Sequence, residues 1–198
     1  FLHPVLKFRI DFPKDWEINN QPTQVVAKAP KADIYMLLQP VEMPQGRTME
    51  DVAANAMGRA GFRLMQGGRT TIDGQDAFLG LYQGQLQDLG TVSMRAAFFQ
   101  HERDVYMLAG FAAPNVFPQA ENAVLESIRS FKRLSTAEAE NIHPNRIDLY
   151  VVRSGDTWQS IADRSGGVIK ASTLAVMNDA QPDSQPAVGM RIKIVVGG

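Results

Sequence analysis

The 198-residue sequence contains no cysteine, only three histidines and no long apolar run. The absence of cysteine excludes disulfide bonds, thiol nucleophiles and thiolate metal sites. The two longest apolar stretches, residues 34–38 and 106–113, are far shorter than the roughly 20 residues that a membrane-spanning helix needs. The sequence therefore predicts no transmembrane segment.

Neither sign of charge predominates in the chain. It has 20 Lys and Arg against 21 Asp and Glu, which gives a formal net charge of −1. A protein that binds nucleic acid through bulk electrostatics needs a basic excess, so nucleic acid is not an expected partner. The composition, 44% hydrophobic and 21% charged, is typical of a globular protein with a buried core. Because the sequence begins with Phe1 and shows no leader, we expect it to be part of a longer polypeptide.

The first 135 residues have the pattern of an α+β domain. Apolar residues that alternate with polar ones predict strands at residues 7–12, 25–29 and 34–39, and the last two of these form a hairpin. A helix follows Thr48, because apolar residues then recur at helical spacing and two acidic residues occupy the first turn.

A meander of antiparallel strands is predicted over residues 63–112, in which Gly67 and Gly68 form a tight turn. A second amphipathic helix begins at Pro114 and is closed by Phe131. Strands, a helix, a strand meander and a second helix together predict an α+β domain, in which helices flank an antiparallel sheet.

A second, smaller domain is predicted at residues 148–198, after a polar connector at residues 136–147. Its expected order is β-α-α-β. The first strand covers residues 149–153, Ser172 caps the second helix, and the last strand covers residues 190–196.

Residues with catalytic potential do not form a recognisable constellation. His101-Glu102 begins like the His-Glu-x-x-His motif of zinc proteases, but Val105 stands where the second histidine is needed. The flanking alternation favours a solvated hairpin tip instead. The sequence has no nucleophile elbow and no phosphate-binding glycine loop. We therefore predict no catalytic residue, metal site or cofactor within this chain.

Residues 148–196 resemble a LysM module. The resemblance rests on a Val-rich strand before Gly155-Asp156-Thr157, on Ile161-Ala162, on Leu174 to Asn178, and on the spacing of Gly189, Ile192 and Ile194. LysM modules bind glycans that contain N-acetylglucosamine, chiefly peptidoglycan in bacteria, through a shallow groove between two loops. The resemblance implies a peptidoglycan or chitin-like glycan as partner, held by Gly155, Asp156, Thr157 and Trp158 on one side and by Asn178, Asp179 and Ala180 on the other.

Trp158 departs from the family pattern, in which an aliphatic residue usually follows Gly-Asp-Thr. The loop after Asn178 is also longer and richer in proline than usual. The large ring of Trp158 has two possible roles, because it can fill a small core or form the wall of a sugar groove.

The first domain resembles PsbP-like domains, which are antiparallel sheets flanked by helices. The resemblance lies in Phe8-Arg-Ile-Asp-Phe-Pro-Lys-Asp-Trp16, in the turn Ile72-Asp-Gly-Gln-Asp-Ala77, and in a late helix that ends Leu125-Glu-Ser-Ile-Arg-Ser-Phe131.

The order of the two domains is similar to the C-terminal region of bacterial exported zinc metalloproteases of the HtpX-like class. In that class a connector like residues 134–139 and a stretch like Pro144-Asn-Arg-Ile147 join the sheet domain to a LysM-like tail. The resemblance implies a non-catalytic accessory region in the periplasm or cell envelope, with a protease domain and its zinc ion upstream.

Two alternatives to this function stay open. In one, the chain is a free-standing envelope adaptor whose sheet domain binds protein partners; in the other, the LysM-like unit is degenerate and only docks on the first domain.

Overall fold

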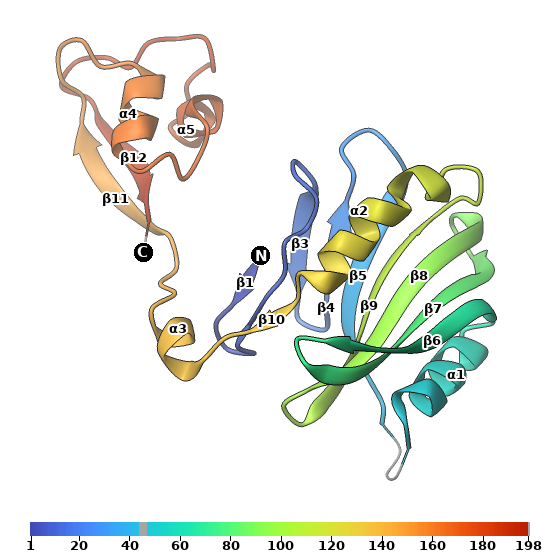
Figure 1. Ribbon diagram of the computed structural model, residues 1–198. Coiled ribbons are helices and arrows are strands. Elements are labelled where there is room, and N and C mark those ends of the chain that lie inside the picture. The colour runs from blue at the N-terminus through green and yellow to red at the C-terminus, as the bar shows by residue number, and fades with distance from the viewer. Residues whose placement is uncertain (44–46, 198) are drawn as a thin grey trace. The chain divides into compact units, whose positions relative to one another are not determined.

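The computed structural model describes residues 1–43 and 47–197. Residues 44–46 and residue 198, the last of the predicted second domain, lie outside the described part. The chain forms two compact units, residues 1–139 and 140–198 (Figure 1). None of the helices in the described residues is long and apolar enough to span a membrane.

The first unit is built on a seven-stranded antiparallel sheet with the order β3-β4-β5-β9-β8-β7-β6 (Figure 1). Its strands are β3 (Glu17–Gln21), β4 (Gln24–Lys28), β5 (Ile34–Val41), β6 (Arg63–Ile72), β7 (Gln75–Leu86), β8 (Gly90–His101) and β9 (Asp104–Ala112). A small antiparallel sheet joins β1 (Leu2–His3), β2 (Phe8–Arg9) and β10 (Lys132–Arg133). The predicted α+β class with an antiparallel sheet is confirmed.

The central strands of the large sheet, β8 and β9, are buried on both faces. Helix α1 (Met49–Arg59) packs on β6, β7 and β8, and helix α2 (Phe117–Arg129) packs on β5, β8 and β9. Along β8, Ala96 and Phe98 belong to the core cluster of α1, whereas Ala97 and Phe99 belong to that of α2. Because successive side chains of a strand point to opposite faces, an unbroken apolar run is what a doubly covered strand requires.

Helix α1 begins where the sequence predicts. Thr48 is its N-cap and accepts a hydrogen bond from the backbone N–H of Asp51, while the Asp51 carboxylate accepts one from the backbone N–H of Thr48. This reciprocal capping box satisfies two of the donors that a helix start leaves free. The hydrogen bonds from Thr48 are also the main reason that the pKa of Asp51 lies below its usual range.

The predicted tight turn at Gly67 and Gly68 is wrong, because strand β6 runs through both residues. The ring of Phe78 on the paired strand β7 lies over Gly67, where an added Cβ would come within 2.6 Å of the ring. Glycine is therefore needed here for a close approach and not for chain reversal. The reversal comes later, at Asp73 and Gly74, where both residues have positive φ angles.

The turn at Asp73 is attached to the small sheet. Its carboxylate accepts hydrogen bonds from the backbone N–H and the Nε of Arg133, both at 3.0 Å, and pairs with Lys132 at 3.3 Å. Burial by itself would raise the pKa of Asp73, but these contacts outweigh it and hold the pKa below its usual range.

His101 lies at the predicted hairpin, but it is not solvated. Its ring is only 3% exposed and packs edge-on against Phe8 and Phe131. Its Nε2 donates to the backbone carbonyl of Leu6, which ties β8 to the N-terminal segment. The charged reversal itself is formed by the next residue, Glu102, at a φ of 53°. His101 is therefore a core residue of the first unit.

The second unit has the predicted β-α-α-β order. It contains β11 (Arg146–Val151), α4 (Trp158–Arg164), α5 (Ala171–Met177) and β12 (Arg191–Val196), and the two strands pair antiparallel. Ser172 lies inside α5 and does not cap it, since the N-cap is Lys170. Part of the predicted connector is regular: it contains helix α3 (Thr136–Glu140) and the first residues of β11.

Replacing Gly110 on β9 with alanine should destabilise the first unit. An added Cβ would lie 2.4 Å from a methyl carbon of Val124 on α2, and a β-branched side chain has little freedom to move away. Overpacking of this kind costs about 1–3 kcal/mol of unfolding free energy, which chemical denaturation measures. Gly68→Ala is the matched control, because no atom lies within 4 Å of its added Cβ. Equal stability of the two variants would contradict the close packing of α2 on β9.

Candidate functional site

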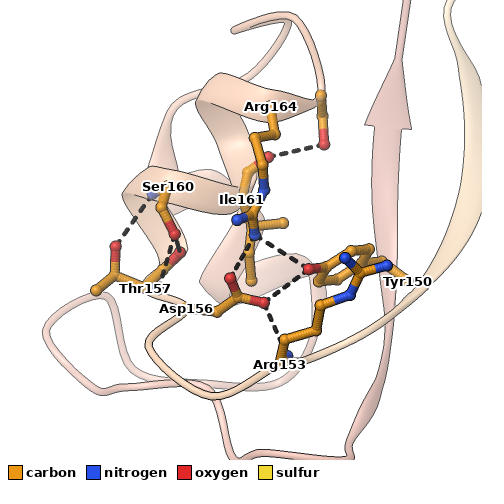
Figure 2. Close-up of polar contacts among 8 residues, drawn as sticks. Tyr150, Arg153, Asp156, Thr157, Ser160, Ile161 and Arg164 are labelled. Carbon is orange, nitrogen blue, oxygen red and sulfur yellow. Dashed lines mark hydrogen bonds and ion pairs between the residues drawn. The ribbon is translucent and has the colours of Figure 1, made fainter.

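The loop between β11 and α4 is organised around the carboxylate of Asp156. This carboxylate accepts hydrogen bonds from the Tyr150 hydroxyl and from the backbone N–H of Arg153, both at 2.8 Å, and it pairs with the Arg164 guanidinium (Figure 2). The Asp156 side chain is only 4% exposed. Asp156 thus joins the end of β11 to the last turn of α4.

These partners stabilise the ionised form of Asp156. The Arg164 guanidinium, and after it the Arg153 N–H, lower the pKa of this carboxyl to about 2. The same contacts shift the pKa values of the partners in the opposite direction. The hydrogen bond to Asp156 raises the pKa of the Tyr150 hydroxyl and that of Arg164. Near neutral pH the cluster therefore holds the Asp156 carboxylate, the neutral Tyr150 phenol and the Arg164 guanidinium.

The next two predicted site residues form the start of α4. Thr157 is the N-cap: its hydroxyl accepts from the backbone N–H of Ser160 at 3.0 Å, and the Ser160 hydroxyl accepts from the N–H of Thr157 at 2.9 Å (Figure 2). Trp158 is the first helical residue and is only 3% exposed, within the core of the unit. Its indole N–H donates to the Ser184 hydroxyl at 3.4 Å, in the loop after α5.

The other predicted side of the groove lies at the end of α5. The Asn178 amide donates to the carbonyls of Leu174 and Lys193 and accepts from the backbone N–H of Lys193. Its side chain therefore pairs with the outer edge of β12 as a neighbouring strand would. Asp179 is exposed and has a φ of 58°, and Ala180 packs partly against the core.

The two predicted sides meet through the core of the second unit. Trp158 lies in the core, Ala180 packs against it, and the Trp158 indole reaches the loop after α5. The polar groups of Asp156 and Asn178 are engaged inside the unit, and the buried ring of Trp158 has no free face for a sugar to stack on. Gly155 and Asp179 are the exposed members of the predicted set. A glycan contact by any of the seven residues stays a prediction.

Sequence reasoning missed the residues that hold Asp156 in place. No role was predicted for Tyr150, Arg153 or Arg164, although helical spacing could have indicated the position of Arg164. Arg164 follows the N-cap Thr157 by seven residues, which is two helical turns, so it lies on the same face as the loop that precedes the helix. Within the described residues, no group of three or more His, Cys, Asp or Glu side chains is placed to hold a metal ion.

Comparison with known proteins supports both parts of the fold. Residues 150–195 match the LysM domain family. The solution structure of cyanobacterial PsbP (CyanoP) from Synechocystis sp. PCC 6803 is similar at a TM-score of 0.53 and 13% identity, over 67% of this chain and 90% of CyanoP. No curated protein matches the sequence.

Two further solved structures are more distant. LpqN of Mycobacterium tuberculosis, described as involved in cell envelope biogenesis, has a TM-score of 0.44 and 12% identity over 65% of this chain and 83% of its own. A Bacteroides thetaiotaomicron protein has a TM-score of 0.49 and 12% identity over 85% of this chain and 61% of its own. At these scores the likeness supports no conclusion about this chain. The fold is thus α+β, with a PsbP-like sheet unit and a LysM domain after it.

Replacing Asp156 with asparagine should lower the thermal stability of the second unit at neutral pH. The variant should also lose less stability than the wild type does when the pH falls from about 4 to about 2. The unfolded carboxyl titrates near pKa 3.9, whereas the folded one titrates at about 2. The stabilisation is therefore complete above about pH 4 and is lost as the pH falls through about 2. Thermal unfolding followed by Trp158 fluorescence, with Trp16 replaced by phenylalanine in every variant, reports on this unit.

The matched control for this experiment is Asp163→Asn, because Asp163 is an exposed carboxylate on α4 that accepts a hydrogen bond from Gln159. We expect this variant to unfold at nearly the wild-type temperature at pH 7. If Asp156→Asn behaved in the same way, Asp156 would not be what holds the loop to the helix.

Proposed function

We propose that the second unit binds a glycan that contains N-acetylglucosamine, with peptidoglycan as the natural ligand. The observation that carries this proposal is the LysM match over residues 150–195, together with a fold in which the loop before α4 and the loop after α5 meet at Trp158. The ligand would lie between these two loops, on the segments 155–158 and 178–180.

In this proposal the interior side chains shape the groove and the exposed groups contact the sugar. Asp156, Trp158 and Asn178 hold the two loops in place through their internal contacts. Asp179 presents an exposed carboxylate, and Gly155 presents backbone without a side chain. Sugar hydroxyls are suitable partners for such groups, because hydrogen bonds to a charged acceptor are stronger than those between neutral groups.

We further propose that this chain is the non-catalytic accessory region of an envelope metalloprotease, with the zinc-binding domain upstream. The support for this proposal is the order of a PsbP-like unit and a LysM-like tail. Here the wall-bound tail keeps the enzyme close to its site of action, since tethering makes a second contact intramolecular. A His-Glu-x-x-His helix in the reading frame upstream of Phe1 would support the proposal, and a signal peptide directly before Phe1 would refute it.

The alternative is an envelope adaptor whose sheet unit binds a protein partner. A cleft of about 350 Å³ in the first unit favours it. Its floor contains the apolar side chains of Phe8, Val25 and Leu38, and its rim contains polar groups such as His3 and Asp104. Clefts with an apolar floor and a few polar groups are typical of binding sites. Under this alternative the LysM-like unit is structural and the chain is not retained on the wall.

The glycan proposal is tested by replacing Asp179 with glycine. Glycine adopts the positive φ of this position freely, so the variant should fold as the wild type does while it loses the exposed carboxylate. Loss of a charge-assisted hydrogen bond predicts binding weaker by roughly tenfold or more. The measurement is retention of the intact chain on purified insoluble peptidoglycan, in competition with soluble N-acetylglucosamine oligomers.

Asp163→Ala serves as the control for charge, because it removes an exposed carboxylate on α4 outside the predicted groove. It should be retained as the wild type is. Trp158→Ala is less suitable, because loss of a buried ring costs about 3–5 kcal/mol and would unfold so small a unit. Absence of wild-type retention would refute glycan binding and leave the adaptor alternative.

A further inference from the structure

A small cleft opens on the second unit between Tyr150 and helix α4, and none of the predicted groove residues lines it. Its volume is about 210 Å³. The apolar side chains of Ile161, Ile194 and Val196 line one part of it. The polar part is formed by Tyr150, by Ser165 and by two arginines, Arg153 and Arg164.

The two arginines lie against the same aromatic ring. The guanidinium carbon of Arg164 is 5.5 Å from the centroid of the Tyr150 ring, and that of Arg153 is 5.9 Å from it. Figure 2 shows both guanidinium groups beside this ring. Guanidinium groups are attracted to the face of an aromatic ring, so the ring orients both of them.

Only one of these two charges has a counter-charge. Asp156 pairs with Arg164. Arg153 contacts Asp156 through its backbone N–H, and its guanidinium forms no ion pair with any residue in the described ranges 1–43 and 47–197. The cleft therefore carries an excess of one positive charge, placed on a side chain that the ring holds at its rim.

The shape and charge of the cleft indicate the chemical class of its ligand. A guanidinium presents a planar pair of donors that matches a carboxylate, and the apolar lining suits a small aliphatic group attached to that carboxylate. A peptide that ends in alanine has both features. Inorganic phosphate has the charge but no apolar part that could pack against Val196, which is the partly exposed apolar residue of the lining.

We propose that this cleft binds the terminal carboxylate and methyl group of the short peptides attached to peptidoglycan. The proposal rests on the glycan function above and extends it from the sugar to the peptide. Arg153 receives the carboxylate, and Ile161, Ile194 and Val196 contact the methyl group. The second unit thereby distinguishes bacterial wall from chitin, which has the same sugar and no peptide.

The test compares two soluble probes on the intact chain by calorimetry: the peptidoglycan disaccharide that carries a peptide ending in alanine, and an N-acetylglucosamine oligomer without peptide. The wild type should bind the peptide-bearing probe roughly tenfold more tightly, and this preference should weaken with added salt. In Arg153→Gln the preference should fall to within about twofold, with oligomer binding unchanged. The fold should persist, because the backbone N–H that contacts Asp156 remains.

The control variant is Arg191→Gln, which removes an exposed arginine on β12 that does not line the cleft. It should keep the wild-type preference. A third probe, the same peptide with its terminus amidated, should bind the wild type as weakly as the oligomer does.

The failures of the two proposals are distinguishable. Equal wild-type binding of the peptide-bearing probe and the oligomer would overturn the peptide site and leave the glycan function standing. Binding of neither probe would overturn both. A preference that survives Arg153→Gln would also overturn the assignment of the carboxylate to this residue.

Discussion

Because a unit as small as the second one buries little apolar surface, its shape depends on the buried carboxylate of Asp156. This single group joins the Tyr150 hydroxyl, the chain at Arg153 and the end of α4 at Arg164. A buried charge is tolerated only when its partners satisfy it, and three partners do so here. The arrangement also leaves the Arg153 guanidinium beside the Tyr150 ring without an acidic partner in the described chain, which makes the adjoining cleft positive.

The residues that carry the LysM resemblance act mainly within the fold. Thr157 caps α4, Trp158 fills the core and links two loops, and Asn178 satisfies the outer edge of β12. A motif of this kind identifies the architecture, because its side chains hold the loops in place. Under the glycan proposal, ligand contacts would instead depend on exposed residues such as Asp179.

The first unit depends on a different constraint, which is a sheet whose central strands are covered on both faces. Helix α2 approaches the sheet closely because a glycine on β9 provides the space, and a glycine on β6 provides space for a ring of the neighbouring strand β7. Val124 of α2 lies against Gly110, and the ring of Phe78 lies over Gly67. An ion pair between Arg95 on β8 and Glu121 on α2 fixes the helix further. Likeness to CyanoP at 13% identity establishes this fold and leaves its partners to be found by experiment.

The sequence by itself determined the elements whose signals are local. The capping box of Thr48, the reversal at Asp73-Gly74 and the β-α-α-β order of the second unit follow from residues close together in the chain. Strand β3 escaped prediction because all its residues are exposed and no alternation marks it. Only the tertiary structure decided that His101 and Trp158 are buried and that Gly67 lies within a strand. These features depend on partners distant in sequence, such as Phe131 against His101 and Ser184 against Trp158, and no local pattern records such contacts.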